Sequence, residues 1–368
     1  MTICIAVASA GCGNNDTMIQ KSDSLTVEND KNETPQDDSD YDTFPVRLEL
    51  SLTDTVSVDA ECIFPDSCIH GTAEQVRSTS DSLWNHKNKI VDYFWKEKKP
   101  DKEYNEKYEN QEIVTYLQED QELSLSVASN GYLTWYSPQA SFVQNVLFSD
   151  ERFDDYNGDK YLQLEDLPFM TQEEARKEVA SFLEQLGVEV SDETICYVMD
   201  HDTMQDEEAR IYSGTPDLKP VNIKEIWTEA DDCYCFMTST ACDGYRVIPP
   251  FTGEGTDDYN VTVLLDRTGV IFAGIQGYYP LEKAEEVQIK GPEAAAEKAA
   301  QLLGDIISDN TYLIKKIALC QKVLEYDASR QMGRIVPVWE CTVLVRPEEG
   351  EEYTEKLLFK AETLEGIR

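Results

Sequence analysis

The sequence has few of the residues that carry common enzyme chemistry or that bind polyanions. Only three of its 368 residues are histidine, and none stands in the paired spacing of a zinc site. It has no GxSxG nucleophile motif, no phosphate-binding glycine loop and no GxGxxG after a strand. Lys and Arg total 32 against 72 Asp and Glu, a net charge of −40. Because such a field repels phosphate backbones, we expect no nucleic acid partner. Because the motifs of known catalytic sites are missing, we expect no catalytic residue.

What remains is the composition of a folded protein. The hydrophobic fraction is 41% and the aromatic fraction 10%, which is enough to bury a core. The length predicts two or three compact units. Ten cysteines are many for a reducing compartment, and in an exported chain this number predicts disulfides.

The N-terminus resembles a bacterial lipoprotein signal. Residues 3–11 form an apolar run that ends in Ser9-Ala10-Gly11-Cys12. The resemblance implies that residues 1–11 are a signal peptide and that Cys12 carries a lipid anchor. Ser9 stands where Leu is usual, and no basic residue precedes the run, so an ordinary cytosolic N-terminus is the alternative.

An acid-rich tether is predicted to follow the anchor. Residues 13–45 contain nine acids and two lysines among Asn, Ser and Thr, with only scattered apolar residues. Such a segment cannot bury enough surface to offset its ordering entropy. We therefore expect residues 12–45 to be disordered and to hold the rest of the chain on the extracytoplasmic face of the membrane, in a Gram-positive cell.

The first folded unit is expected over residues 46–168. Apolar residues alternate with polar ones at 46–52 and 56–60, which predicts two strands. Residues 72–96 have helical periodicity. Strand-like segments flank Asn130-Gly131, which predicts a hairpin.

Two further units are expected, over residues 169–288 and 289–368. Thr171 and Glu174 form a capping box at the start of a helix that Gly187 ends. Gly291-Pro292 opens a second helix 120 residues later, and strand-like sequence follows each helix. The fold class expected is α+β, in tandem units of a helix packed on an antiparallel β-sheet. Chance periodicity is the alternative.

Three segments in these units resemble elements of PepSY-like modules and of the extracytoplasmic YycH/YycI-type regulators and lipoproteins of Firmicutes. They are Thr171–Ala175, Val261–Gly269 and Ile335–Glu340. The resemblance covers about residues 165–368 and implies a helix-on-sheet fold with a regulatory or protein-binding role. The sequence lacks the transmembrane helix of the YycH/YycI proteins.

Eight cysteines follow the anchor and are the disulfide candidates: Cys62, Cys68, Cys196, Cys233, Cys235, Cys242, Cys320 and Cys341. A hairpin centred between residues 320 and 341 would bring Cys320 opposite Cys341. Cys62 and Cys68 would close a local loop. By analogy between the units, Cys196 would meet Cys233 or Cys235, and the other would meet Cys242. A cysteine metal site is the poorer alternative, because Cys233-Tyr-Cys235 lacks zinc-site spacing.

One segment resembles a calcium-binding loop. Asp155, Asn157, Asp159, Tyr161 and Asp166 stand at loop positions 1, 3, 5, 7 and 12 of an EF-hand or dockerin-like pattern. Lys160 replaces the turn glycine, and Asp166 replaces the bidentate glutamate. A structural Ca²⁺ ion is the only cofactor that the sequence suggests, and a simple turn at Asn157-Gly158 is the alternative.

Three functions follow from these observations. The first is a non-enzymatic, membrane-anchored lipoprotein that acts as a protein-interaction or regulatory module with an envelope protein partner. An envelope hydrolase acting on glycan or peptide is the second, because abundant Asp and Glu could supply paired carboxylates. A calcium-braced binding protein is the third.

Overall fold

The structure is a computed structural model of the 368-residue chain. It describes residues 43–68, 71–78, 83–96, 99–108, 111–148, 158–162, 165–213, 223–248, 259–278, 281–306, 309–327 and 332–367. All of these belong to one compact unit, Asp42–Arg368.

Five α-helices and seventeen β-strands form in the described residues. The helices are α1 (Lys87–Trp95), α2 (Pro138–Leu147), α3 (Gln172–Gln185), α4 (His201–Ser213) and α5 (Pro292–Gly304). Two short 3₁₀ helices are η1 (Asp66–Cys68) and η2 (Gly158–Tyr161). The strands are β1 (Arg47–Ser51), β2 (Val56–Ile63), β3 (Thr72–Ser78), β4 (Lys102–Lys107), β5 (Glu112–Gln118), β6 (Leu123–Ala128), β7 (Tyr132–Tyr136), β8 (Val190–Met199), β9 (Cys233–Cys242), β10 (Tyr245–Ile248), β11 (Val261–Asp266), β12 (Gly269–Ile275), β13 (Leu281–Gln288), β14 (Thr311–Asp327), β15 (Met332–Arg346), β16 (Tyr353–Lys360) and β17 (Gly366–Ile367).

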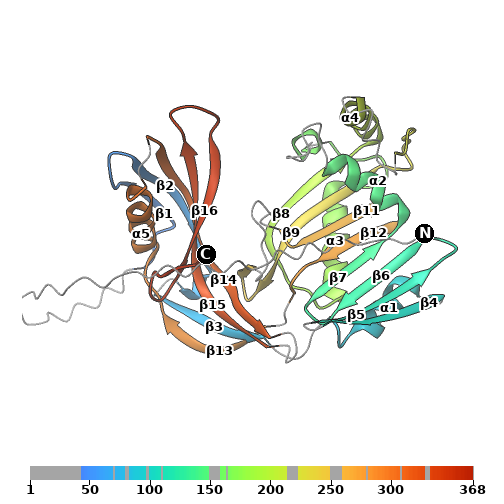
Figure 1. Cartoon of the computed structure of the whole chain (residues 1–368), viewed down its shortest axis with the longest axis horizontal. Coiled ribbons are helices and arrows are strands. Elements are labelled where there is room, and N and C mark those ends of the chain that lie inside the picture. The colour runs from blue at the N-terminus through green and yellow to red at the C-terminus, as the bar shows by residue number, and fades with distance from the viewer. Residues whose placement is uncertain are drawn as a thin grey trace, which may run out of the picture. The chain divides into compact units, whose positions relative to one another are not determined.

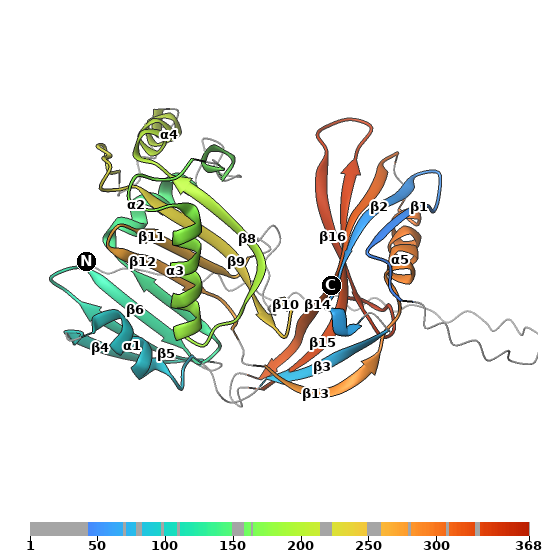
Figure 2. The same cartoon turned by 180° about the vertical axis from the view of Figure 1, so that it is seen from behind.

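Two antiparallel meanders form one half of the strand network. The first runs β4-β5-β6-β7 and the second β8-β9-β11-β12, and their last strands, β7 and β12, pair with each other. Helices α1 and α3 contribute to the core on one face, and α2 and α4 to the core on the other (Figures 1 and 2). We call this half the meander sheet.

A long hairpin of β14 and β15 organises the other half, which we call the hairpin sheet. Strand β2 runs parallel to the first part of β14, and β10 runs parallel to its later part. Strand β15 pairs with β16 along most of its length and with β3 near its start, and β3 pairs with β13. Helix α5 covers one face, where its alanines pack on buried residues of β2, β14 and β15 (Figure 1).

Strand β10 connects the two halves. It pairs with the end of β9 through Tyr245 and Arg246, and with β14 through Val247 and Ile248. The described strands therefore form a single hydrogen-bonded network of seventeen strands. The protein is a mixed helix-and-sheet fold with mostly β structure.

Most of the locally predicted elements are confirmed. Strands β1 and β2 form where the alternation predicted them, and β6 and β7 form a hairpin around Gly131 at φ +79°. The capping box of Thr171 and Glu174 opens α3, and Gly187 follows its end at φ +73°. Helix α5 begins at Pro292 as predicted.

The helix predicted over residues 72–96 is wrong in its first part. Residues 72–78 form β3, and among the described residues of this range the helix is limited to Lys87–Trp95. The reason is long-range pairing, because β3 lies between β13 and β15, which are more than 200 residues away in the sequence. Tertiary contacts of this kind override local periodicity.

The chain segments expected to form separate units share one sheet. Strand β1 pairs with β2, β2 pairs with β14, and β3 pairs with β13 and β15. Strands β4 to β7 instead join strands from residues 190–275 through the pair of β7 and β12. The hairpin sheet therefore takes strands from all three expected units: β1 to β3 from the first, β10 and β13 from the second, and β14 to β17 from the third.

Candidate functional site

The predicted disulfide between Cys320 and Cys341 is wrong. The hairpin register pairs Cys320 with Val338 and Cys341 with Ile317. The two thiols point to opposite faces of the sheet, since Cys341 lies under α5 and Cys320 lies in the cluster on the other side. Bulges near Ile314 and Val323 shift the register away from a simple centred hairpin.

The pairings proposed for Cys196 are also wrong. Cys196 faces the core under α3, while Cys233 and Cys235 share the opposite face, and Cys242 lies in a further cluster. Neighbours on a strand alternate between faces, so no adjustment of side chains joins them. All eight described cysteines, including Cys62 and Cys68, carry free thiols. They fill the cores as small apolar residues.

The residues of the predicted calcium loop are only partly described. Asp155 and Asn157, and the side chain of Asp159, lie outside the described part. Tyr161 is buried, and Asp166 accepts a hydrogen bond from the backbone N–H of Gln172 at 2.8 Å. No group of three or more metal-ligating side chains gathers among the described residues. Calcium binding at this loop stays a prediction.

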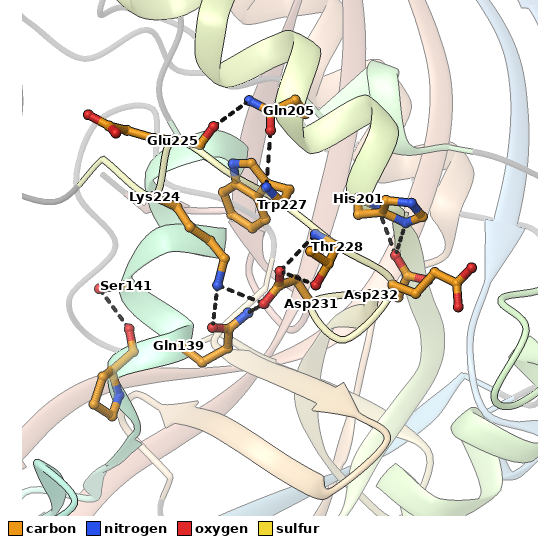
Figure 3. Close-up of polar contacts among 12 residues, drawn as sticks. Gln139, Ser141, His201, Gln205, Lys224, Glu225, Trp227, Thr228, Asp231 and Asp232 are labelled. Atoms are coloured by element: carbon orange, nitrogen blue, oxygen red, sulfur yellow. Dashed lines mark hydrogen bonds and ion pairs between the residues drawn. The ribbon is translucent and has the colours of Figure 1, made fainter.

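Buried carboxylates gather instead around α4 and the segment 224–232 that precedes β9. Figure 3 shows two of them, Asp231 and Asp232. Glu207, Glu208, Asp231 and Asp232 are between 1% and 8% exposed. Ionised carboxylates are seldom buried unless they are hydrogen-bonded or paired, so each of them must have partners.

Glu208 fixes the start of this segment. Its carboxylate accepts hydrogen bonds from the backbone N–H of Lys224 and of Glu225, both at 3.0 Å, and from the indole Nε1–H of Trp227 at 3.1 Å. One turn earlier on α4, Gln205 accepts from the backbone N–H of Trp227 and donates to the carbonyl of Glu225, both at 3.0 Å. Two side chains of α4 thus bind the loop at five points.

Asp231 fixes the other end. Its carboxylate accepts from the backbone N–H of Thr228 at 2.9 Å and from the amide of Gln139 on α2 at 2.9 Å. Nζ of Lys224 lies 2.7 Å from the same carboxylate (Figure 3). It also lies 5.4 Å from the ring centroid of Phe142 and 5.5 Å from that of Trp227. Burial acts to raise the pKa of Asp231, but the bonds from Lys224 and Thr228 outweigh it and lower the pKa.

His201 and Asp232 attach α4 to the start of β9. Asp232, 1% exposed, accepts at 2.8 Å from the backbone N–H of His201 and lies 2.8 Å from its Nδ1. The hydrogen bond that the His201 ring donates to Asp232 raises the pKa of His201 above 6.5, although burial opposes it. Asp200 caps the same helix by accepting from the backbone N–H of Thr203 at 2.9 Å.

This framework holds one apolar side chain out in solvent. Ile226 is 72% exposed, while Trp227 beside it is 6% exposed. Glu225 before it has φ +68°, a left-handed conformation that costs a non-glycine residue about 1–2 kcal/mol. We call residues 224–228 the Ile226 loop. Strained backbone persists where surrounding contacts enforce it, and it is frequent at functional sites.

The sequence reasoning missed this site. Trp227 and the pair Asp231-Asp232 before a strand were the available signals, but in a chain with 72 acids four carboxylates do not stand out. Their burial comes from packing between α2, α4 and the strands, which no local pattern shows.

Comparisons with known proteins identify the fold alone. No family model matches the chain, and no curated protein sequence matches it. A crystal structure of an uncharacterized protein from Eubacterium rectale is similar, with a TM-score of 0.64 at 16% identity. The similarity covers 88% of this chain and 94% of that one. Among the described residues, no helix is long and apolar enough to span a membrane.

Proposed function

We propose that this protein is a non-enzymatic, lipid-anchored module of the extracytoplasmic face that binds a protein partner through the Ile226 loop. The observation that carries the proposal is Ile226, 72% exposed on a loop that the buried side chains of Glu208 and Asp231 hold rigid.

Rigidity is what separates Ile226 from an ordinary exposed apolar residue. Single exposed apolar side chains are common on protein surfaces and need no function. Ordering a loop on binding costs free energy, and a loop already fixed by five hydrogen bonds to α4 avoids that cost. Burying the carboxylates of Glu208 and Asp231 and holding Glu225 in a left-handed conformation both cost free energy. We infer that exposing Ile226 in this way serves a function.

The charge around the loop describes the partner. Glu225 and Glu229 are exposed on either side of Ile226, and the whole chain carries a net charge of −40. The matching surface is an apolar pocket with a basic rim, since complementary charge speeds association and selects the partner. An envelope protein is the expected partner.

The location rests on the N-terminal sequence. Cys12 after a run of small residues and the acidic tether support a lipid anchor, in a Gram-positive cell. The described cysteines form no disulfides, so the extracytoplasmic location is supported by this motif and the tether alone. Mass spectrometry of the protein from its native cell tests the lipid anchor, and an unmodified Met1 would rule it out.

The finer fold expectation is a tandem of PepSY-like units. It is supported by an order of elements that recurs, in which a helix precedes an antiparallel meander: α3 before β8, β9, β11 and β12, and α5 before β14 to β17. Helix α1 before β4 to β7 has the same order.

Photo-crosslinking on intact cells tests the interaction. A photoreactive residue at position 226 should capture a discrete partner, and one at Val46, which is equally 72% exposed, should not. Glu208→Gln keeps Ile226 but weakens the loop contacts, and it should reduce capture several-fold. Equal capture at both positions, or capture indifferent to Glu208→Gln, would contradict the proposal.

Calcium is tested separately, by calorimetric titration of the protein and of Asp155→Ala. A binding heat that the substitution abolishes would support a calcium brace, and no heat from the unaltered protein would end that idea.

A further inference from the structure

A cavity of about 230 Å³ lies beside β10, where the two sheets meet. The residues after β2, the first half of β8, the β9–β10 turn and the middle of β14 line it. It is smaller than the roughly 300–1,000 Å³ of sites for drug-sized ligands, so only a small molecule, such as a short carboxylic acid, would fit.

Arg246 of β10 supplies the positive group in its wall. The side chain is 12% exposed, and its Nη2 lies 2.6 Å from Oε1 of Glu340 and donates to Sγ of Cys320 at 3.5 Å. A guanidinium carries five N–H donors in a planar fork. Both of these contacts use the same nitrogen, and within the described part of the chain Nε and Nη1 make no further contact that would keep them from a ligand.

Glu340 does not depend on Arg246 alone. Lys356 of β16 lies 3.4 Å from the same Oε1 of Glu340. A buried carboxylate with two cationic neighbours keeps its compensation when one of them also binds a ligand. Arg246 can therefore engage an incoming anion without leaving Glu340 unpaired.

The other walls limit what that anion can be. Glu189, Asp192 and Glu193 line the cavity from β8 and the turn before it, and all three are exposed. Glu193 is paired with Lys316, and the other two add negative charge at the rim. A polyanion would be repelled there. A ligand with one negative and one positive group would be attracted by Arg246 at one end and by the acids of the rim at the other.

The remaining lining is apolar. Ile63, Phe64, Pro65, Ala318 and Leu319 also line the cavity, and Ile63 and Ala318 are paired neighbours on β2 and β14. An aliphatic side chain that packs against these residues would be removed from water, at about 25 cal/mol per Å² of apolar area.

We propose that this cavity binds a small zwitterion, a free α-amino acid with an aliphatic side chain. Its carboxylate meets the guanidinium of Arg246, its ammonium meets the acids of the rim, and its side chain contacts the apolar wall. This site is separate from the Ile226 loop.

Calorimetric titration with L-leucine as the probe tests the proposal. Leucinamide lacks the carboxylate and 4-methylpentanoate lacks the ammonium, so each should bind at least about tenfold more weakly, the effect of about 1.4 kcal/mol. No heat with leucine up to about 10 mM, or equal binding of all three compounds, would overturn the proposal.

Variants locate the site. Arg246→Gln alone leaves Glu340 with one cation fewer and could unfold the sheet, so we pair it with Glu340→Gln, which keeps the local charge balanced. This double variant should lose leucine binding while retaining the circular dichroism of the unaltered protein.

A second variant covers the case in which the first does not fold. Asp192→Asn with Glu189→Gln, at the exposed rim, should weaken the binding of leucine but not that of 4-methylpentanoate. Ile226→Asp, at the other site, should bind leucine normally. Leucine binding that survives both sets of changes would rule this cavity out.

Discussion

Single carboxylates determine the local structure around α4. Glu208 accepts three hydrogen bonds from the Ile226 loop, and Asp232 accepts two from His201, while both are at most 3% exposed. A buried carboxylate loses its contacts with water, and these N–H donors replace them. Acids occupy these positions because the groups around them are hydrogen-bond donors, mostly backbone N–H groups. No other side chain accepts as many hydrogen bonds as a carboxylate.

Glu208→Ala should destabilise the protein. It leaves two backbone N–H groups and one indole N–H without their acceptor, and an unsatisfied buried donor costs about 1–3 kcal/mol. Urea unfolding followed by tryptophan fluorescence measures the loss. Glu351→Ala, an exposed acid between β15 and β16, is the control and should leave the midpoint unchanged.

The pair of His201 and Asp232 should make stability depend on pH. The folded pKa of His201 is raised, chiefly by its hydrogen bond with Asp232, above the ordinary 6.5. A raised pKa means that the folded state holds the proton more tightly, so the stabilisation is complete below pH 6.5 and is lost as pH rises through the folded value.

We expect the free energy of unfolding of the protein to exceed that of His201→Gln by more at pH 5.5 than at pH 8.5. Denaturant titrations of both proteins at several pH values measure this difference, in which the titration of all other groups cancels. A difference that is constant with pH would mean that the pair carries no charge.

At the scale of elements, what could be predicted from the sequence depends on whether local signals decide the structure. The Thr171 capping box, the turn at Gly131 and the start of α5 at Pro292 are local, and all three are confirmed. The register of β14 with β15 is set by two bulges, and the strand at residues 72–78 by distant partners. Those features, and the burial of the carboxylates around α4, follow from packing and could not be derived from the sequence pattern.

Gly131 and Gly187 have nearly the same φ angle but different surroundings. Comparing alanine substitutions at the two positions therefore distinguishes the cost of backbone strain from the cost of a steric clash. A Cβ at Gly131, φ +79°, would lie 2.2 Å from the carbonyl oxygen of Tyr278, whereas a Cβ at Gly187, φ +73°, would meet nothing within 4 Å. Gly187→Ala should cost about 1–2 kcal/mol from backbone strain alone.

Gly131→Ala should cost clearly more, because the turn and the segment at Tyr278 must also move apart and break the 2.9 Å bond from the Tyr278 N–H to the Gly131 carbonyl. Thermal unfolding of the two variants compares them. Equal losses would show that the contact at Tyr278 relaxes freely.

At the scale of the whole molecule, free thiols are distributed through all the cores. Seven of the eight described cysteines are buried, and Cys196 is intermediate. Burial raises the pKa of the thiols of Cys62, Cys242 and Cys341 to about 12 and those of Cys196 and Cys320 to about 11. Because the thiolate is the reactive form, these groups should react slowly in the folded protein, and the buried ones should not react at all.

Alkylation with iodoacetamide at pH 8, read by peptide mass spectrometry, should therefore label Cys196 first and the other seven only in urea. Disulfide-linked peptides between any of the eight would contradict the structure.

The pairing of β2 and β3 with β13, β14 and β15 has a consequence for the order of folding. Strands β2 and β3 are synthesised early but must wait for strands near the C-terminus, whereas β5, β6 and β11 pair with strands close to them in the sequence. Contacts of high sequence separation form slowly, because a long loop must close first. During refolding we expect amide protons of β5, β6 and β11 to be protected before those of β2 and β3. Until the C-terminal hairpin arrives, residues 47–78 present unpaired strand edges, and a chaperone or a second chain could occupy them first.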